Sequence, residues 1–301
     1  MVNPKATTVS ARLKRLIGHA LESRYDIELV ETAAPNHATA LARDAVDAGF
    51  DLVIAFGGDG TVNEVANGLA GSDVPLSVLP GGSTNVVCRM LEIPPDVVDA
   101  TEHMLALADR VEPRRIDLGC VNGRYFVSSG GVGLDADTTR WVDDHPRLKA
   151  HAGPFSFSIV GARSFYLTYA GRPPCLIVEA GGERIEGVSA IAQNSDPYTY
   201  FNSRPIRVCE GERLESGFFS MAVLRRARRR DAPFLARKLL SGRVSATDHH
   251  QVVGLCELDH ARVTAADPHD GRLPVQVDGD YIGDFAELDF SVRRGALAVV
   301  S

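Results

Sequence analysis

The residues of this sequence best suited to chemistry lie in a glycine-rich turn at residues 57–61, which reads GGDGT. An apolar run at residues 53–56 precedes it and predicts a parallel strand that is covered on both faces. Glycine permits positive φ and lets backbone N–H groups approach a ligand closely. A helix would begin here, so its N-terminus and the exposed carboxylate of Asp59 would face an anion together. This combination suits the phosphate groups of a nucleotide and their metal ion.

The helix after the turn is expected to begin with a capping box. Thr61 and Glu64 have the T-x-x-E spacing, in which each side chain accepts a backbone N–H group at the start of the helix. Val62, Val65 and Leu69 recur at helical spacing and predict its inner face. The turn matches neither the P-loop G-x-x-x-x-G-K-S/T nor the dinucleotide motif G-x-G-x-x-G. On spacing alone, a plain turn that joins a strand to a helix remains the alternative.

A second glycine loop follows the next apolar run, at residues 76–79. It reads PGGST, and Ser83 and Thr84 are placed to cap a helix or to contact a phosphate. Since the carboxyl ends of parallel strands meet at one edge of a sheet, the two loops would line one crevice. A predicted helix at 11–23 and a predicted strand at 27–32 extend an alternation that is typical of a parallel α/β domain.

The pattern changes near Pro113, where short strands and turns replace the alternation of strands and helices. Asn122 and Gly123 predict the turn of a β-hairpin, and Asp135 is expected to cap a helix over residues 136–141. Strands of a sandwich are predicted at 176–180, 185–192 and 218–224. The predicted fold class is an N-terminal α/β nucleotide-binding domain with a parallel sheet, followed by a mostly β, sandwich-like C-terminal domain.

The segment GGDGTVNEV resembles the glycine motif of the diacylglycerol kinase family, which also includes sphingosine and ceramide kinases. The NAD kinases and phosphofructokinases are distant relatives of that family. The resemblance extends over nearly the whole chain. It includes N-P-x-A at 3–6, T-x-x-x-x-H-A at 32–38, PGGSTN at 80–85, D-L-G at 117–119 and D-G-D at 278–280.

The resemblance implies an ATP-dependent lipid kinase with ATP and Mg²⁺ as cofactors and diacylglycerol as the first candidate acceptor. It implies an ATP-binding domain at residues 1–113 and a lipid-substrate domain at 114–287, with a return strand at 288–301 that completes the first domain. The residues implied at the nucleotide are Asn3, Thr32, Gly57, Gly58, Asp59, Gly60, Thr61, Asn63, Glu64, Gly82 and Ser83.

The resemblance also implies roles for several carboxylates. Asp59 would organise Mg²⁺ through water, Asp280 would accept the proton of the lipid hydroxyl as general base, and Asp117 would face the cleft. Glu210 and Glu215 lie in a loop that binds a structural Mg²⁺ in some relatives, through carboxylate and backbone carbonyl oxygens.

Thr7, Val86, Glu210 and Asp280 stand where other residues are commoner in the resembled family. These departures keep open a nucleotide- or lipid-binding homologue without catalysis. A sphingoid-base or ceramide-type kinase is a further alternative, because lipid selectivity depends on pocket shape rather than on a motif. An NAD kinase is less well supported, since the β-rich second half and the D-G-D turn fit a lipid kinase better.

The composition limits the cellular setting. The chain has 301 residues and a net charge of −7, which argues against a general nucleic-acid binder. Its five cysteines are scattered without a C-x-x-C pair, so neither a disulfide framework nor a zinc site is predicted and a reducing cytoplasm is favoured. Surface positions are expected for the loop histidines His145, His151, His249, His250, His260 and His269.

Membrane contact is expected to be peripheral. No apolar run approaches the ~18 residues of a membrane span. Five arginines between 225 and 230, with Arg237 and Lys238, form the one dense basic cluster of the sequence. A lipid kinase without a span has to reach the bilayer, so we expect this cluster to dock on the anionic inner face of the membrane. The sequence leaves a homodimer open.

Overall fold

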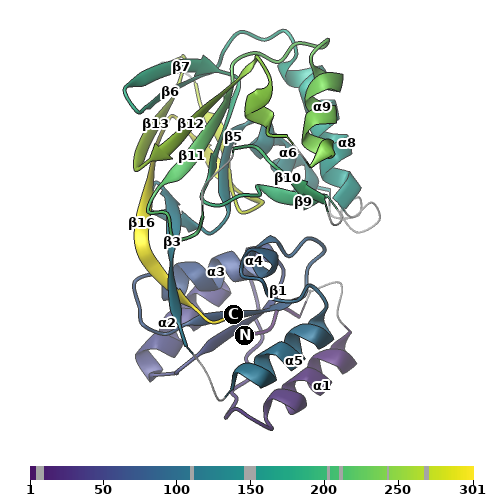
Figure 1. Ribbon diagram of the computed structural model, residues 1–301, viewed down its shortest axis with the longest axis vertical. Helices are drawn as coiled ribbons and strands as arrows, with labels where there is room; N and C mark the ends of the chain where they lie inside the picture. Colours follow the sequence, from purple (N-terminus) through teal and green to yellow (C-terminus); the bar gives the residue numbers. More distant parts are fainter. Residues whose placement is uncertain are drawn as a thin grey trace. The chain divides into compact units, whose positions relative to one another are not determined.

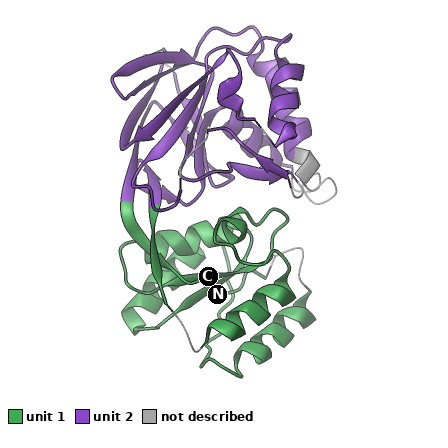
Figure 2. Cartoon of the chain, viewed as in Figure 1, with its two compact units in different colours: residues 1–117, 294–301 green, residues 118–293 purple. Residues whose placement is uncertain are grey.

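The computed structural model (Figure 1) describes residues 1–4, 10–108, 112–145, 154–201, 204–209, 213–242, 244–267 and 271–301. The chain divides into two compact units (Figure 2). Unit 1 comprises Met1–Asp117 and Arg294–Ser301, and unit 2 comprises Leu118–Arg293. The boundary expected from the sequence, at residue 113, lies four residues before the end of the first segment of unit 1.

Unit 1 is an α/β structure around parallel strands, as predicted. Its central strands, β1 (Val53–Gly57) and β2 (Leu76–Pro80), pair in parallel over their whole length. Both are largely buried, because helices α3 and α5 pack against them. The described helices of this unit are α1 (Ala11–Leu21), α2 (His37–Ala48), α3 (Asp59–Leu69), α4 (Val86–Met90) and α5 (Val97–Leu107).

Single bridges extend this sheet on both sides. Val2 forms isolated parallel bridges to Phe56 of β1 and to Glu31. On the other side, Val299 at the end of β16 (Glu287–Val299) pairs in parallel with Leu76. The strand predicted at 27–32 was wrong in extent, since only Glu31 is bridged there. Among the described residues, Val2 is the one bridged to this segment.

The core of unit 1 includes the inner face of α3. Val65, Ala66 and Leu69 are completely buried, and Val62 is nearly so, as the helical spacing predicted. Burying a valine or leucine side chain contributes about 1.5–3 kcal/mol to folding. This packing fixes the glycine turn at the start of α3, because the turn is continuous with the buried helix.

Unit 2 is a mostly β structure of two packed sheets, as predicted. One sheet is antiparallel throughout and has the order β12-β11-β8-β5-β14-β15. Its strands are β12 (Val252–Leu258), β11 (Phe219–Leu224), β8 (Ser189–Gln193), β5 (Ser129–Gly133), β14 (Leu273–Val277) and β15 (Asp280–Phe285).

The facing sheet runs from the first part of β16 through β13 (His260–Ala265) and β6 (Leu176–Ala180) to β7 (Glu183–Gly187). Side chains of both sheets meet in one core that contains Phe126, Phe219 and Phe290. Phe126 and Phe290 make an edge-to-face contact with ring centroids 6.4 Å apart. Burial alternates along β6 and β13, as a strand with one face on the core requires, whereas β5 is buried along its whole length.

Two turns of unit 2 test the sequence-based boundaries. Asn122 and Gly123 have φ of 47° and 84° and join β3 (Arg114–Val121) to β4 (Arg124–Phe126), so the predicted hairpin is confirmed. The single strand predicted at 185–192 was wrong. The chain leaves one sheet at the end of β7 and enters the other at β8, which divides the apolar run between two sheets.

The remaining described elements of unit 2 lie outside the two sheets. They are α6 (Leu134–Asp143), α8 (Pro154–Ser164), the π-helix η1 (Phe165–Tyr169), β9 (Thr199–Phe201), β10 (Arg204–Ile206), α9 (Ala232–Ser241) and the 3₁₀ helix η2 (Ala246–Asp248). Among the described helices of the whole chain, none has both the length and the hydropathy needed to cross a bilayer.

Candidate functional site

The two glycine loops of unit 1 are in direct contact at the carboxyl ends of β1 and β2. The Gly81 N–H donates to the carbonyl oxygen of Gly57 at 2.8 Å. A Cβ atom added to Gly82 would lie 2.8 Å from the Cα of Gly58, closer than carbon atoms can pack. The backbones of the two loops can therefore approach this closely because position 82 is glycine, whereas a Cβ on Gly58 would make a tight contact of 3.3 Å with the Cα of Gly82.

Asp59 links the starts of two helices across this contact. It occupies the first turn of α3, and its Oδ1 accepts a hydrogen bond from the N–H of Val87, in the first turn of α4, at 3.2 Å. The side chain is half-buried. A carboxylate near a helix N-terminus is stabilised by the unpaired N–H groups there. The charge of Asp59 is thus held at the junction of the two glycine loops.

The predicted capping box was wrong. Helix α3 begins three residues earlier than expected, with Gly58 in extended conformation as N-cap and no side-chain cap. Thr61 therefore lies inside the first turn, where its Oγ1 accepts from Nδ2 of Asn3 at 3.0 Å. Glu64 instead accepts the N–H of Ala38 at 3.1 Å, so it caps helix α2. The two side chains bond to other elements because the helix starts before them, at Asp59.

Several residues expected at the nucleotide gather at this edge of unit 1. Asn3 contacts Thr61, and the N–H of Thr32 donates to the carbonyl of Val2, the residue before Asn3, at 2.9 Å. Asn63 differs, because it is 1% exposed and its Oδ1 accepts from Nδ2 of Asn67 within α3. The geometry therefore connects Asn3, Thr32 and Thr61 to the loops and gives Asn63 a partner inside its own helix.

The second glycine loop is closed by a residue that sequence reasoning missed. Asn85 has φ of 49° and is the N-cap of α4. Its Oδ1 accepts from the Gly82 N–H and its Nδ2 donates to the Gly82 carbonyl, both at 2.9 Å. The expected capping of this helix by Ser83 or Thr84 was wrong, because Asn85 is the N-cap and its side chain makes no capping bond. The carboxylate of Asp59 caps the helix instead, by accepting the N–H of Val87. Tolerance of the left-handed region by asparagine was the available signal.

Asp117 has a backbone partner at the end of the first segment of unit 1. It is 5% exposed, and its Oδ1 accepts the N–H of Gly295 at 2.7 Å. This bond ties the outgoing chain to the returning strand β16. The geometry gives Asp117 a structural task, whereas its catalytic role remains a prediction.

The D-G-D turn of unit 2 is held by side-chain acceptors. Asp278 and Gly279 have φ of 46° and 86° and join β14 to β15. The carboxylate of Asp278 accepts three backbone N–H groups at 2.8, 2.8 and 3.0 Å, from Val127, Ser128 and Ser129. Asp280, the expected base, is half-buried at the first position of β15. The turn that presents it is therefore anchored to the start of β5.

Gln276 and Asp135 extend this anchoring into the unit; sequence reasoning missed Gln276 and gave Asp135 a different role. Gln276 Oε1 accepts the N–H of Gly279 at 2.8 Å, and its Nε2 donates to Oδ2 of Asp135 at 2.6 Å. The hydroxyl of Tyr198 donates to the other oxygen of Asp135 at 2.8 Å. A glutamine inside the apolar alternation of β14 was the one available signal, because a buried amide requires partners.

The expectation that Asp135 caps a helix was wrong. Helix α6 begins at Leu134 with Gly133 as N-cap and no side-chain cap. The carboxyl group of Asp135 instead lies in a desolvated position, and burial raises its pKa although Tyr198 and Gln276 donate hydrogen bonds to it. The pKa of the Tyr198 hydroxyl is also raised, by burial and then by the neighbouring Asp135. Asp135 therefore belongs to a polar network and does not cap the helix.

The expected Mg²⁺ loop is only partly described. Glu215 is exposed, and Glu210 lies outside the described residues, as do His151 and His269. Of the other expected surface histidines, His145, His250 and His260 are exposed.

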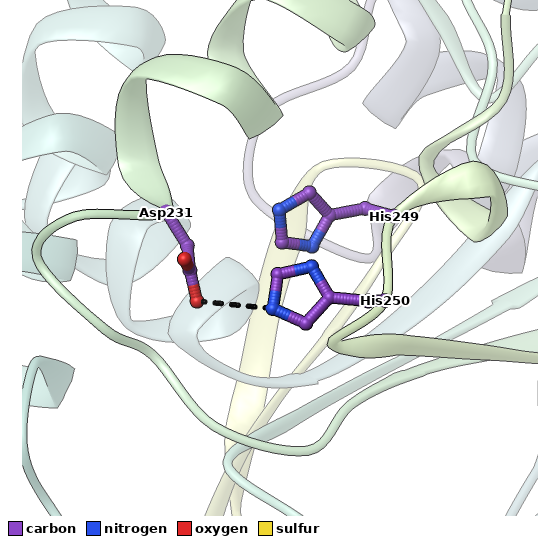
Figure 3. Close-up of side chains that lie close together, drawn as sticks. All are labelled: Asp231, His249 and His250. Atoms are coloured by element: carbon purple, nitrogen blue, oxygen red, sulfur yellow. Dashed lines mark ion pairs between the residues drawn. The ribbon is translucent and has the colours of Figure 1, made fainter.

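His249 was predicted at the surface, and that prediction was wrong. It is 6% exposed and lies beside His250 and Asp231, whose ligand atoms are within 4.8 Å of one another (Figure 3). The N–H of Gln251 donates to Nδ1 of His249 at 3.2 Å, so the neutral ring carries its proton on Nε2. That tautomer offers no lone pair at Nε2 to a metal, and we assign none to this cluster.

Known proteins resemble this chain in sequence and in fold. Residues 1–121 match the model of the diacylglycerol kinase catalytic domain. A diacylglycerol kinase of Bacillus subtilis (strain 168) is 29% identical over 269 residues, which cover 87% of this chain and 82% of that protein. A diacylglycerol kinase of Staphylococcus epidermidis is 32% identical over 154 residues, about half of each chain.

Solved structures reproduce the whole fold. The crystal structure of a diacylglycerol kinase from Bacillus anthracis str. Sterne matches with a TM-score of 0.70 and 17% identity, covering 99% of this chain and 94% of that one. A second crystal structure from the same organism reaches a TM-score of 0.78 at 19% identity and covers 99% and 93% of the two chains. Residues 1–121 therefore match the catalytic domain of the diacylglycerol kinase family, and the chain is similar to diacylglycerol kinases over most of its length.

Proposed function

We propose that this protein transfers the γ-phosphoryl group of ATP to the hydroxyl group of a lipid, with diacylglycerol as acceptor and phosphatidic acid as product. The observation that carries the proposal is the contact between the two glycine loops, with Asp59 at their junction in the first turn of α3. Glycine backbone N–H groups at a helix N-terminus favour phosphate oxygens. The catalytic-domain match and the names of the relatives support the kinase chemistry and the choice of acceptor.

We assign the nucleotide to the edge of unit 1 where the loops meet. Gly57, Gly58 and Gly60 would approach the phosphates with their backbones, and Gly82 and Ser83 would do so from the second loop. Thr61 would contribute its hydroxyl group. Asn3, Thr32, Asn63 and Glu64 would line or support the same edge, and the bond between Asn3 and Thr61 supports this for the first of them.

The residues at the junction fit a magnesium ion. The carboxylate of Asp59 is a hard oxygen ligand of the kind that Mg²⁺ prefers, either directly or through water. When bound, the ion would neutralise charge on the phosphate oxygens during transfer. In this proposal Asp59 places a negative charge at the helix N-terminus, and the hydrogen bond from Val87 restrains its side chain there.

Asp280 would accept the proton of the lipid hydroxyl as general base. The lipid oxygen then forms a bond to the γ-phosphorus while the bond from that phosphorus to the bridging oxygen breaks, and ADP leaves with the electron pair. The hydrogen bonds of Asp278 and Gln276 support this role, because they hold the turn that presents Asp280.

The test is transfer of label from γ-labelled ATP to four acceptors offered separately: diacylglycerol, sphingosine and ceramide in micelles, and NAD in solution. We expect labelled phosphatidic acid, and the D59N protein prepared in the same way should be at least about a hundredfold less active, which controls for contaminating kinases. Label on sphingosine or ceramide alone would replace diacylglycerol as acceptor, and labelled NADP would reject a lipid kinase. ATP binding without any labelled product would indicate a non-catalytic binding protein.

A further inference from the structure

The exposed apolar side chains of unit 2 are concentrated on two segments. Within its described residues, every large apolar side chain that is exposed lies either on α8 and η1 or on α9 and the residues directly after it. The first segment exposes Ile159, Tyr166 and Leu167, and the second exposes Phe234, Leu240 and Val244. Phe165 and Tyr169 of η1 share a core cluster with Ala232 and Leu235 of α9, so the two segments are neighbours (Figure 1).

Helix α9 has apolar side chains on two faces. Leu235 and Leu239 pack inward against the cores of unit 2, yet no residue of the helix is fully buried. The opposite side exposes Phe234 to 63% and Leu240 to 45% of their surface. A surface helix normally turns charged residues to solvent on that side. Its apolar outer side therefore indicates a partner that removes it from water.

Basic residues surround this outer side. Arg229 and Arg230 are exposed just before α9, and Arg237 is exposed within it. The side chain of Arg230 has a carboxylate nearby, Asp231, at the long distance of 3.8 Å. In a protein with a net charge of −7, such a cationic region next to exposed phenylalanine and leucine complements an anionic surface with an apolar interior. A lipid bilayer has that structure.

We propose that the α9 face, defined as Phe234, Leu240 and Val244 with Arg229, Arg230 and Arg237, docks onto an anionic lipid bilayer. The proposal rests on the proposed function, because it brings the enzyme to the membrane that contains its acceptor. Phe234 and Leu240 enter the region between headgroups and acyl chains, and the arginines bind anionic headgroups. Apolar insertion and charge attraction therefore act together, whereas the sequence alone pointed only to charge.

Vesicle sedimentation tests the α9 face with two matched pairs of variants. The double variant F234Q/L240Q removes the apolar contact, and its control is L16Q/L29Q, which alters side chains of unit 1 exposed to 53% and 51%. R229E/R230E reverses two charges of the face, and its control is R12E/R15E on the exposed side of α1. The probes are vesicles of phosphatidylcholine alone and of phosphatidylcholine mixed with phosphatidylglycerol.

We expect the wild-type protein to bind the anionic vesicles and to lose binding as salt rises. F234Q/L240Q should weaken binding roughly tenfold or more, since each apolar side chain leaves the membrane. R229E/R230E should weaken it by at least about fivefold for each cation removed. Both control pairs should bind as the wild type does. The proposal would be overturned if a face variant and its control lost vesicle binding equally. It would also be overturned if the wild type bound vesicles equally well with and without phosphatidylglycerol.

Activity separates a failure of docking from a failure of the proposed function. With a short-chain diacylglycerol dispersed in water, both face variants should turn over like the wild type, while on anionic vesicles they should be slower in proportion to their binding. If the wild-type protein is inactive on every acceptor, the proposed function is wrong. The sedimentation experiment then tests docking by itself. Loss of activity on the dispersed acceptor in variants whose thermal melting is unchanged would overturn docking as the task of this face.

Discussion

The glycine loops of unit 1 and the D-G-D turn of unit 2 both present an aspartate at the end of a strand, but different contacts hold them. In unit 1, Asp59 is positioned by its own helix. The turn just before Asp59 contacts the second glycine loop through backbone atoms of Gly58 and Gly82. In unit 2, the turn before Asp280 is held by side chains, above all those of Asp278 and Gln276. Substitutions should therefore act through backbone space in unit 1 and through buried polar partners in unit 2.

The largest effect is expected at Asp280, which tests the side-chain half of this comparison. D280N keeps the shape of the side chain but cannot accept a proton, so kcat should fall roughly 10²- to 10⁴-fold while KM for ATP barely changes. D280E should stay active. Steady-state kinetics with diacylglycerol micelles measures both. An Asn variant with wild-type kcat would show that Asp280 is only a residue of the turn.

The D59N variant tests whether charge or backbone shape matters in the glycine loops. It removes one charge and no core packing, so kcat/KM should fall roughly 10²- to 10³-fold at saturating Mg²⁺ with an unchanged thermal midpoint. The hydrogen bond from Val87 can still be accepted by the amide oxygen. Near-normal turnover together with normal folding would contradict the role of Asp59. It would indicate that the backbone of the glycine loops suffices for the site.

The backbone contact itself is tested by G82A. The added Cβ would meet the Cα of Gly58 at 2.8 Å, so the loops must separate, at about 1–3 kcal/mol of unfolding free energy. We expect ATP affinity to fall roughly tenfold because displaced N–H groups no longer match the phosphates. G161A is the matched control, since its Cβ would meet nothing nearer than 3.8 Å. Calorimetric titration with ATP showing equal affinity in both variants would refute close contact as the requirement.

Gln276 sharpens the comparison because its role in unit 2 is indirect. Q276M leaves Asp135 and the Gly279 N–H without their partner, which should cost about 1–3 kcal/mol for each buried group. The Asp280 turn then loosens, so kcat should fall about tenfold with KM for ATP unchanged. Q193M is the control, because Gln193 is equally buried and the side-chain bonds that it makes among the described residues go to the backbone of Cys209. The same kcat loss in both variants would indicate general destabilisation instead of positioning.

The smallest effect concerns pH, and it arises from the burial of His249 in unit 2. Burial and the neighbouring His250 lower the pKa of His249 from its ordinary value of 6.5. The unfolded chain then binds the proton more readily, so stability should be lost as pH falls from about 6.5, the ordinary pKa, through the lower pKa of the folded state. Urea unfolding of the wild type and of H249Q, above and below that pH, measures the difference. A variant that loses as much stability on acidification as the wild type would show that His249 does not cause the loss.

The sequence by itself determined the features that depend on neighbouring residues. The glycine turn after β1, the buried face of α3, the Asn122–Gly123 hairpin and the change from α/β to β structure near residue 113 all follow from local spacing and backbone preference. The resemblance of GGDGTVNEV to a kinase motif belongs with them, since glycines and one aspartate in a short run carry it.

Only the tertiary structure decided which partner each polar side chain takes. Thr61 and Glu64 have the spacing of a capping box, yet they bond to Asn3 and Ala38 because those groups come from elements that pack against α3. Asp135 binds Tyr198 and Gln276, which are 63 and 141 residues away in the chain. Hydrogen bonds require geometry within a few tenths of an ångström, and sequence spacing specifies that geometry only within one helix or turn.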